Sequence, residues 1–262
     1  MTDNPSSTLS SPSVNWQHWL ERWDAQQTGY IPHREERFQT MLDVLEILLP
    51  ENFAAIDLAC GPGAISQRLL KRFPHAHCVA IDYDPVLLAI GQGVLGNMGD
   101  RLRWIEADLT QDAWLKQVGE IQVDAVLTTT ALHWLPIDRL VHLYQKLGQI
   151  LRPGGVFLNG DHLYFPPHLV TLRHVAKAVQ TQQEEQAFSV RHQEDWQQWW
   201  EAIEQEAELK ALLAERHRRF QPRFTEHEPT LVIHEAALQE AGFREVSTIW
   251  QRFDDRILLA VR

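Results

Sequence analysis

Short apolar runs that alternate with helix-forming segments constrain the fold of this 262-residue chain more than any other feature. The runs lack the polar alternation of strands with one solvent-facing side, and each precedes a segment compatible with a helix. Strands of this kind are typical of a parallel sheet that helices cover on both faces. The five runs lie at residues 54–58, 77–81, 102–105, 122–127 and 155–160.

The C-terminal part predicts how the sheet closes. A helix that ends at Gly242 precedes two apolar runs, 246–250 and 257–261, which Asp254 and Asp255 join. We interpret these runs as an antiparallel hairpin that returns to the sheet. The sequence therefore predicts an α/β fold: a doubly wound, mostly parallel seven-stranded sheet with an antiparallel final strand and an inserted helical cap.

Segments outside the alternation predict additional helices. Before the first strand, apolar residues at helical spacing predict two amphipathic helices, and the proline and charges between them predict an exposed joint. After residue 162, Trp196, Trp199 and Trp200 share one helical face, where we expect a local core rather than an aromatic cage. The expected organisation is a flexible tail (1–14), N-terminal helices that form a lid (15–49), a Rossmann-like cofactor-binding domain (50–162 and 230–262) and a helical substrate cap (163–229).

The charge balance argues against a nucleic-acid partner. The chain has 24 Lys and Arg against 35 Asp and Glu, and no basic run is longer than Arg218–Arg219. No window has the apolar length of a membrane span, and the N-terminus lacks the features of a signal peptide. Cys60 and Cys78 do not have the spacing of a metal knuckle and fall in predicted core elements, so we expect a reducing cytoplasm. The scattered histidines do not form a metal triad on one helix face, so we expect no metal. The oligomeric state stays open.

Glycines and carboxylates cluster where the predicted strands end, the edge at which doubly wound sheets bind ligands. The first run leads into DLACGPG, residues 57–63, whose glycines allow a ligand to approach the backbone closely. Asp82, 21 positions after Gly61, is placed to accept hydrogen bonds from both hydroxyls of a ribose. Asp108 could accept from an exocyclic amine, and Tyr83 offers its ring to a purine.

The glycine loop distinguishes between two kinds of nucleotide ligand. A dinucleotide loop needs G-x-G-x-x-G and backbone N–H groups aimed at a pyrophosphate. Here Ser66 stands in the third glycine position, Pro62 has no N–H to donate, and Asp57 would repel a phosphate. The ligand implied is a nucleoside attached to a cationic, amino-acid-like tail.

Five motifs in order resemble those of the class I S-adenosylmethionine-dependent methyltransferases, over residues 50–162 and again over 234–262. DLACGPG resembles the D-x-G-x-G-x-G loop of that family, VAIDYDP its ribose-binding strand end, and IEADLTQ its adenine-contacting turn. VDAVLTTTALHWLP and LRPGGVFL resemble its fourth motif and the turn before its fifth strand. The resemblance implies S-adenosyl-L-methionine as cofactor and S-adenosyl-L-homocysteine as product.

The resemblance also implies the cofactor contacts. Ala59 departs from the family, which usually has glycine there, and its methyl group should be tolerated if its φ angle is negative. Tyr30 and Arg34 precede the fold where many small-molecule methyltransferases carry a lid, so they are expected to help close the site; a solvated helix start is the alternative. The remaining expected contacts are Asp57 and the backbone of Ala59, Gly61 and Gly63 for the methionine moiety, Asp82 for the ribose, Tyr83, Asp108 and Leu109 for adenine, and Thr128 and Thr129 for the sulfonium side.

Two histidines at the ends of the fourth and fifth strands are the catalytic candidates. His133 could act as a general base or orient a substrate, although Trp134 beside it could simply pack. His162 follows Asp161, which could position a nucleophile or cap the next segment. The predicted function is methyl transfer to a small-molecule acceptor, which requires alignment and exclusion of water rather than an enzyme nucleophile. The alternatives are a methyltransferase acting on tRNA or protein, and a non-catalytic module that binds S-adenosylmethionine or S-adenosylhomocysteine.

Overall fold

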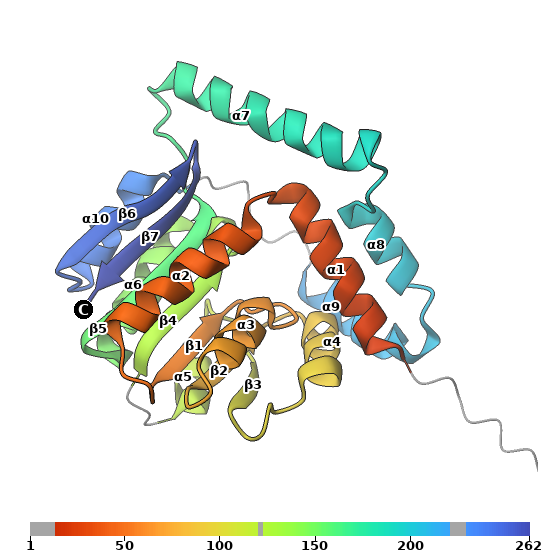
Figure 1. The fold of residues 1–262 in the computed structure, drawn as a ribbon, viewed down its shortest axis with the longest axis horizontal. Helices are drawn as coiled ribbons and strands as arrows, with labels where there is room; N and C mark the ends of the chain where they lie inside the picture. The colour runs from red at the N-terminus through yellow and green to blue at the C-terminus, as the bar shows by residue number, and fades with distance from the viewer. Residues whose placement is uncertain (1–13, 120–122, 221–228) are drawn as a thin grey trace, which may run out of the picture.

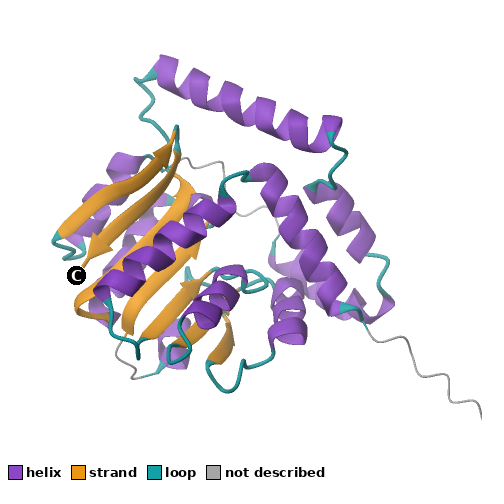
Figure 2. Ribbon diagram, in the orientation of Figure 1, coloured by secondary structure: helices purple, strands orange, loops and turns teal. Residues whose placement is uncertain are grey.

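A seven-stranded sheet organises the chain, and its order is β3-β2-β1-β4-β5-β7-β6 (Figures 1 and 2). The computed structural model describes residues 14–119, 123–220 and 229–262. All neighbouring strands are parallel except β7, which runs antiparallel to both β5 and β6. The predicted fold class is confirmed. The strands are β1 (Ala54–Leu58), β2 (His77–Asp82), β3 (Leu102–Glu106), β4 (Val123–Thr129), β5 (Leu151–His162), β6 (Glu245–Arg252) and β7 (Asp255–Val261).

Helices cover both faces of the sheet because the central strands are apolar on both sides. One face packs against α2 (Arg34–Leu48) and α3 (Ala64–Arg72). The opposite face packs against α5 (Ala113–Val118), α6 (Ile137–Ile150) and α10 (Leu231–Glu240). The remaining helix between strands, α4 (Pro85–Leu95), follows β2 and contacts α1 (Trp16–Tyr30).

The start of β5 differs from the sequence interpretation. LRPGG was expected to form a turn before the strand, whereas β5 begins at Leu151 and contains those residues. The pairing with β4 jumps from Val123↔Leu151 to Ala125↔Val156, so the extra residues form a bulge. Gly154 has φ +78°, a conformation that glycine adopts without steric cost.

The N-terminal helices have two different roles in the packing. In α2, four fully buried side chains, Phe38, Met41, Leu42 and Leu45, lie against the sheet, and each contributes about 1.5–3 kcal/mol by leaving water. The expected exposed joint is wrong, because Ile31, Arg34 and Arg37 are buried. By contrast, α1 packs away from the sheet, against α4 and the inserted segment.

The inserted segment, residues 163–229, is helical in its described part. It contains α7 (Val170–Glu184), a π-helical turn (Glu185–Val190), α8 (Trp196–Ile203) and α9 (Lys210–Arg219), with a short 3-10 turn (Ala207–Leu209) before α9. Its ends meet, because Tyr164 and Thr230 form a parallel β-bridge.

Tryptophans form the core between the inserted segment and α1. Trp199 and Trp200 are buried, as expected, and Trp199 packs edge-on against Trp19 and Trp23 of α1. Trp196 is instead 42% exposed. The core is therefore shared with α1 rather than internal to the inserted segment.

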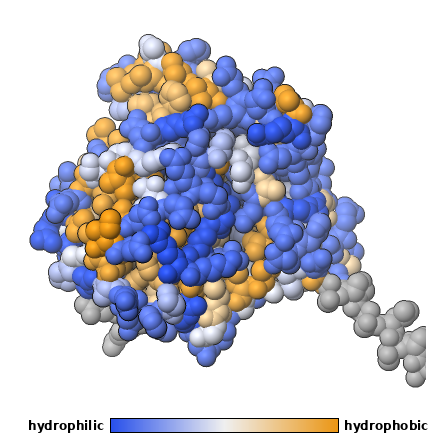
Figure 3. All heavy atoms as spheres, in the orientation of Figure 1, coloured by the Kyte–Doolittle hydropathy of each residue, from blue (hydrophilic) through white to orange (hydrophobic). Residues whose placement is uncertain are grey.

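The helix α7 is the least covered part of the inserted segment. Only Ala176 among its residues is buried, whereas Val170 and Leu172 are exposed. Figure 3 shows the apolar side chains gathered over this helix at the top of the molecule. Among the described residues, no helix has the length and apolar character needed to cross a membrane.

Candidate functional site

The glycine loop between β1 and α3 forms the first part of the site. Gly61 and Gly63 have φ angles of +55° and +83°, and Gly63 is the N-cap of α3. A Cβ on Gly63 would lie 2.7 Å from the ring of Trp104, whereas one on Gly61 would meet nothing closer than 3.9 Å. Gly63 is thus needed for packing, and Gly61 leaves backbone open to a ligand.

Asp57 lies buried beneath this loop at the end of β1. Its Oδ2 accepts hydrogen bonds from the backbone N–H and the hydroxyl of Ser66, at 3.1 and 2.6 Å. Burial raises the pKa of Asp57 to about 7, the Ser66 hydrogen bonds oppose this shift, and the nearby Asp82 charge adds to it. A cation placed close by would favour the ionised form, as expected for a site that takes an ammonium group.

Ala59 adopts a left-handed backbone conformation with φ +53°. The condition for a tolerated methyl group, a negative φ, is therefore not met. For a residue with a Cβ this conformation costs roughly 1–2 kcal/mol. The loop keeps the backbone shape that glycine normally supplies, and the strain lies in the turn where we expect the cofactor.

We expect Ala59→Gly to stabilise the protein by about 0.5–1 kcal/mol, because relief of the left-handed strain exceeds the added flexibility of the unfolded chain. Urea denaturation of both proteins measures this difference. The matched control is Asp100→Gly, since Asp100 has φ +63° in a loop after α4. A loss of stability in Ala59→Gly would contradict strain at this position.

Asp82 closes the loop from β2. Its carboxylate accepts from the backbone N–H of Gly61 at 2.7 Å, of Tyr83 at 2.7 Å and of Asp84 at 2.8 Å. A carboxylate has about four lone-pair positions, so capacity for a ligand hydroxyl remains. Burial raises the pKa of Asp82 to about 6, although the N–H donors of Asp84 and Gly61 oppose the shift.

Cofactor affinity should therefore fall in mild acid. Burial raises the pKa of Asp82 to about 6 and that of Asp57 to about 7, so both carboxyl groups gain a proton as the pH falls through this range. Protonation turns one oxygen of each group into a donor and removes the charge that favours an ammonium, so cofactor affinity is lost over the same range. At pH 5 we expect about tenfold weaker binding of S-adenosylhomocysteine than at pH 7 by calorimetry. An Asp82→Asn variant should keep only the part of this pH dependence that Asp57 contributes, and a dependence equal to that of wild type would show that Asp82 contributes none.

The expected adenine contacts are Tyr83, Asp108 and Leu109. Asp108 accepts hydrogen bonds from the backbone N–H and hydroxyl of Thr110, at 2.9 and 2.6 Å. Leu109 is partly buried against the main core. The Tyr83 ring contacts the end of α9, where Arg219 lies over it and Phe220 lies beside it.

The ends of β4 and β5 bring together the two expected catalytic residues. His133 Nδ1 lies 2.6 Å from Asp161 Oδ1, and the His133 backbone N–H donates to Asp161 Oδ2 at 3.2 Å. The ring of His162 lies 6.1 Å from that of His133, between centroids. The carboxylate of Asp161 thus pairs with the ring of His133, and His162 supplies only its backbone N–H to Asp161, at 2.8 Å.

The protonation state of this pair follows from its burial and charges. Burial alone would raise the pKa of Asp161, but the charge and hydrogen bond of His133, with His162 and Arg37 nearby, hold it well below its usual range. An ionised Asp161 only accepts hydrogen bonds, so His133 Nδ1 carries the proton. In neutral His133, Nε2 is then the proton acceptor.

Neighbouring residues at this edge differ in exposure. Trp134 is 72% exposed, so it does not pack inward as its apolar character suggested, and its ring lies 4.7 Å from that of His133. Thr128 is fully buried, and its hydroxyl has no hydrogen-bond partner among the described residues. Thr129 ends β4 and pairs in register with Gly160.

Sequence reasoning missed Arg37, which connects three strand ends. Its guanidinium donates to Asp255 at 2.6 Å, to the carbonyl oxygen of Gly160 at 2.6 Å and to the Thr130 hydroxyl at 2.9 Å. Its side chain is fully buried. Helical spacing could have identified it, because Arg34, Arg37, Phe38 and Met41 follow the i, i+3, i+4, i+7 pattern of one face.

The expected lid residues have partners outside the glycine loop. The Tyr30 hydroxyl accepts from the Trp196 backbone N–H at 3.1 Å, and its ring lies 4.4 Å from that of Phe188. Arg34 donates to Asp24 at 2.8 Å. Tyr30 therefore joins α1 to the inserted segment. Within the described ranges no cluster of three metal-ligating side chains occurs.

Comparison with known proteins identifies the central part of the chain. Residues 55–155 match a protein family described as "Methyltransferase domain". These residues form a methyltransferase domain. The matched residues include the glycine loop, Asp82, Asp108 and His133, and end within β5.

Two curated relatives of this methyltransferase domain share the name trans-aconitate 2-methyltransferase. The protein from Azoarcus sp. (strain BH72) is 33% identical over 138 residues, which are 52% of this chain and 49% of that protein. The protein from Sinorhizobium fredii is 33% identical over 172 residues, 64% of this chain and 58% of the relative. The chain thus spans about half the length of the curated relatives it matches.

Solved structures share the fold of the methyltransferase domain and its helices. An O-methyltransferase family protein from Burkholderia thailandensis aligns with TM-score 0.55 and 17% identity, over 97% of this chain and 74% of that chain. An O-methyltransferase family 2 protein from Planctomyces limnophilus, solved with apigenin, aligns with TM-score 0.52 and 18% identity, over 95% of this chain and 66% of that chain.

The cofactor of the methyltransferase domain is S-adenosylmethionine. The residues present fit this group on three observations. Gly61 leaves open space where a side chain would stand, Asp82 reaches the loop with hydrogen-bonding capacity remaining, and buried Asp57 favours a nearby cation. Pro62 in the same loop has no N–H, which suits a ligand without a pyrophosphate.

Proposed function

We propose that this chain transfers a methyl group from S-adenosylmethionine to a small-molecule acceptor that carries a hydroxyl or amine proton. The observation that supports this most strongly is the His133–Asp161 pair at the ends of β4 and β5. Asp161 fixes the proton on Nδ1, so Nε2 of His133 remains able to accept one. Exposed Trp134 beside it offers a surface for the acceptor.

The proposed role of the protein is alignment, exclusion of water and proton acceptance. The bound cofactor supplies an electrophilic methyl group on a sulfonium. The acceptor oxygen or nitrogen forms a bond to this carbon as the carbon–sulfur bond breaks, and the bonding electrons remain on sulfur. His133 Nε2 takes the proton that the acceptor loses, and the ionised Asp161 stabilises the resulting imidazolium.

The curated relatives suggest a specific acceptor to test. Trans-aconitate, which their name specifies, carries carboxylic acids that are ionised at neutral pH and have no proton to remove. A base is useful only for an acceptor with a higher pKa. The His133–Asp161 pair therefore favours hydroxyl or amine acceptors over a carboxylate.

A panel of acceptors tests the proposed function. The purified chain is incubated with S-adenosylmethionine and trans-aconitate, hydroxylated small acids, phenols or amines, and S-adenosylhomocysteine and methylated products are measured. Turnover of a hydroxyl or amine acceptor is the expected result. Turnover of trans-aconitate alone, or of tRNA or protein alone, would contradict the proposed acceptor class, and cofactor binding without turnover would favour a non-catalytic module.

We propose that α1 and the inserted segment roof the acceptor side of the site, on a cofactor-binding domain formed by residues 50–162 and 230–262. The N-terminal lid is then α1 alone, since α2 packs on the sheet. Tyr30 supports this arrangement through its contact with the start of α8. Cys60 and Cys78 are free and buried, in keeping with a cytoplasmic location.

A further inference from the structure

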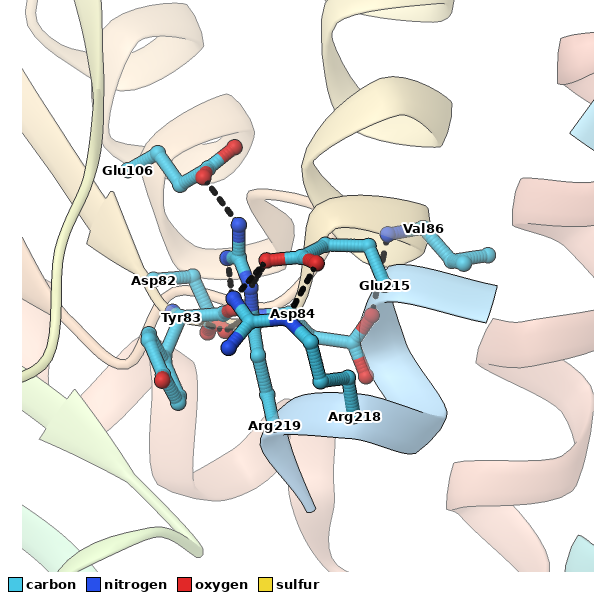
Figure 4. A network of polar contacts seen from close by, with 8 residues as sticks. All are labelled: Asp82, Tyr83, Asp84, Val86, Glu106, Glu215, Arg218 and Arg219. Carbon is cyan, nitrogen blue, oxygen red and sulfur yellow. Dashed lines mark hydrogen bonds and ion pairs between the residues drawn. The ribbon is translucent and has the colours of Figure 1, made fainter. Parts of the chain in front are cut away.

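The end of α9 lies on the turn that carries the expected ribose and adenine contacts (Figure 4). Arg219 donates a hydrogen bond to the carbonyl oxygen of Tyr83 at 2.8 Å and forms an ion pair with Glu106 at the end of β3. One turn earlier, Arg216 pairs with Asp84 at 2.7 Å. These contacts attach the inserted segment to the ends of β2 and β3.

Burial distinguishes the Arg216–Asp84 contact from an ordinary surface ion pair. The side chains of Arg216 and Asp84 are 16% and 6% exposed, and Asp84 also accepts from the first N–H groups of α4. Arg219 is held on a second side by Glu215, which accepts from its Nε at 2.7 Å. A guanidinium with several simultaneous acceptors is fixed in orientation, so the end of α9 has a defined position.

The anchored helix end brings a second aromatic ring to Tyr83. Phe220 directly follows α9, and its ring centroid lies 5.7 Å from that of Tyr83 with an angle of 59° between the planes. Its side chain is 49% exposed, although the Arg216 guanidinium lies over its ring at 5.1 Å. Two tilted rings, one of them half-exposed, form a corner whose faces can pack against a flat aromatic ligand.

We propose that Phe220 is a second aromatic wall of the adenine site, and that Arg216 and Arg219 are positioning residues that hold it there. This inference rests on the proposed function and on the sequence-based expectation that Tyr83 contacts adenine. The inserted segment then takes part in binding the cofactor as well as the acceptor. The position of the segment and the binding of the adenosine become coupled, because both depend on the same helix end.

The position of Arg219 allows a sharp distinction between two roles. Its guanidinium carbon lies 4.9 Å from the centroid of the Tyr83 ring. An arginine that occupied the place of the purine would compete with the cofactor, whereas a positioning residue would support it. The two roles predict opposite signs: Arg219→Ala weakens cofactor binding if Arg219 positions Phe220 and tightens it if Arg219 competes.

Binding of S-adenosylhomocysteine to purified full-length variants tests the inference by calorimetry. Phe220→Ala should weaken binding about tenfold, as expected for loss of an aromatic contact with a base. Phe220→Trp should restore binding to within about threefold of wild type, because an aromatic face is retained. The matched control is Phe253→Ala, since Phe253 is 38% exposed in the β6–β7 turn, at the opposite edge of the sheet from β2 and β3. It should bind like wild type.

Three outcomes decide the question. Weaker binding by Phe220→Ala and Arg219→Ala, with rescue by Phe220→Trp, supports the inference. Wild-type affinity in Phe220→Ala, or tighter binding in Arg219→Ala, overturns it while leaving the proposed function intact. A wild-type chain that binds no S-adenosylhomocysteine overturns the proposed function itself. Thermal unfolding of each variant identifies any loss of binding caused by misfolding.

Discussion

Replacing Asp82 by alanine is expected to weaken binding of S-adenosylmethionine and S-adenosylhomocysteine by about 100-fold or more. The substitution removes the expected ribose acceptor, and a hydrogen bond to a charged group contributes about 1.5–3 kcal/mol. It also leaves the N–H groups of Gly61, Tyr83 and Asp84 without their carboxylate partner. Calorimetric titration with S-adenosylhomocysteine measures the loss.

A second substitution at the same position separates ligand contact from loop shape. Asp82→Asn keeps one carbonyl acceptor and similar volume, so it should fall between wild type and Asp82→Ala. The control is Asp138→Ala, because the Asp138 side chain is 75% exposed at the start of α6. Binding of wild-type strength by a folded Asp82→Ala protein would refute the ribose assignment.

Replacing His133 by alanine is expected to lower kcat by about 10²–10⁴-fold for a hydroxyl or amine acceptor, while cofactor affinity stays close to wild type. The proton acceptor is lost, but His133 makes none of the expected cofactor contacts. Asp161→Asn should also lower kcat, because an amide does not hold the proton on His133 Nδ1 as the carboxylate does. Steady-state kinetics and calorimetry on the same preparations measure the two effects.

A second histidine–aspartate pair provides the matched control for this prediction. His142 on α6 contacts Asp112 through Nε2 at 2.8 Å, and its side chain is 42% exposed. His142→Ala removes an imidazole of the same kind from the surface and should leave kcat unchanged. An unchanged kcat in His133→Ala with a hydroxyl acceptor would show that no base acts at this position.

The sheet could be predicted from the sequence because its signals are local. A strand buried on both faces needs a continuous apolar run, and the residues after each run mark the ligand-binding edge. Asp57, Gly61, Gly63 and Asp82 were placed on this basis, and the structure brings them together around one loop. The backbone angle of Ala59 was not predictable in the same way, since the residue type disfavours the conformation that the loop imposes.

Contacts between distant segments were beyond the reach of local patterns. Asp161 and His133 are 28 residues apart, and they meet only because β4 and β5 are neighbours with a bulge that sets their register. The contact of Arg219 with Glu106 spans 113 residues and depends on how the inserted segment folds back. Charged residues on α2 were interpreted as surface, although a buried guanidinium is tolerated when its terminal donors find acceptors, as those of Arg37 do in Asp255 and Gly160; its Nε has no partner among the described residues.

The bridge between Tyr164 and Thr230 has a consequence for the evolution of acceptor choice. A segment that leaves and rejoins a scaffold at one point can be exchanged or resized as a unit, because loop length has a small entropic effect and the strands keep their register. The ion pairs of Arg216 and Arg219 limit that freedom at one end. We therefore expect related chains to vary the helices before α9 but to keep its last turn. New acceptors would then be accommodated while the contacts proposed to bind the cofactor stay the same.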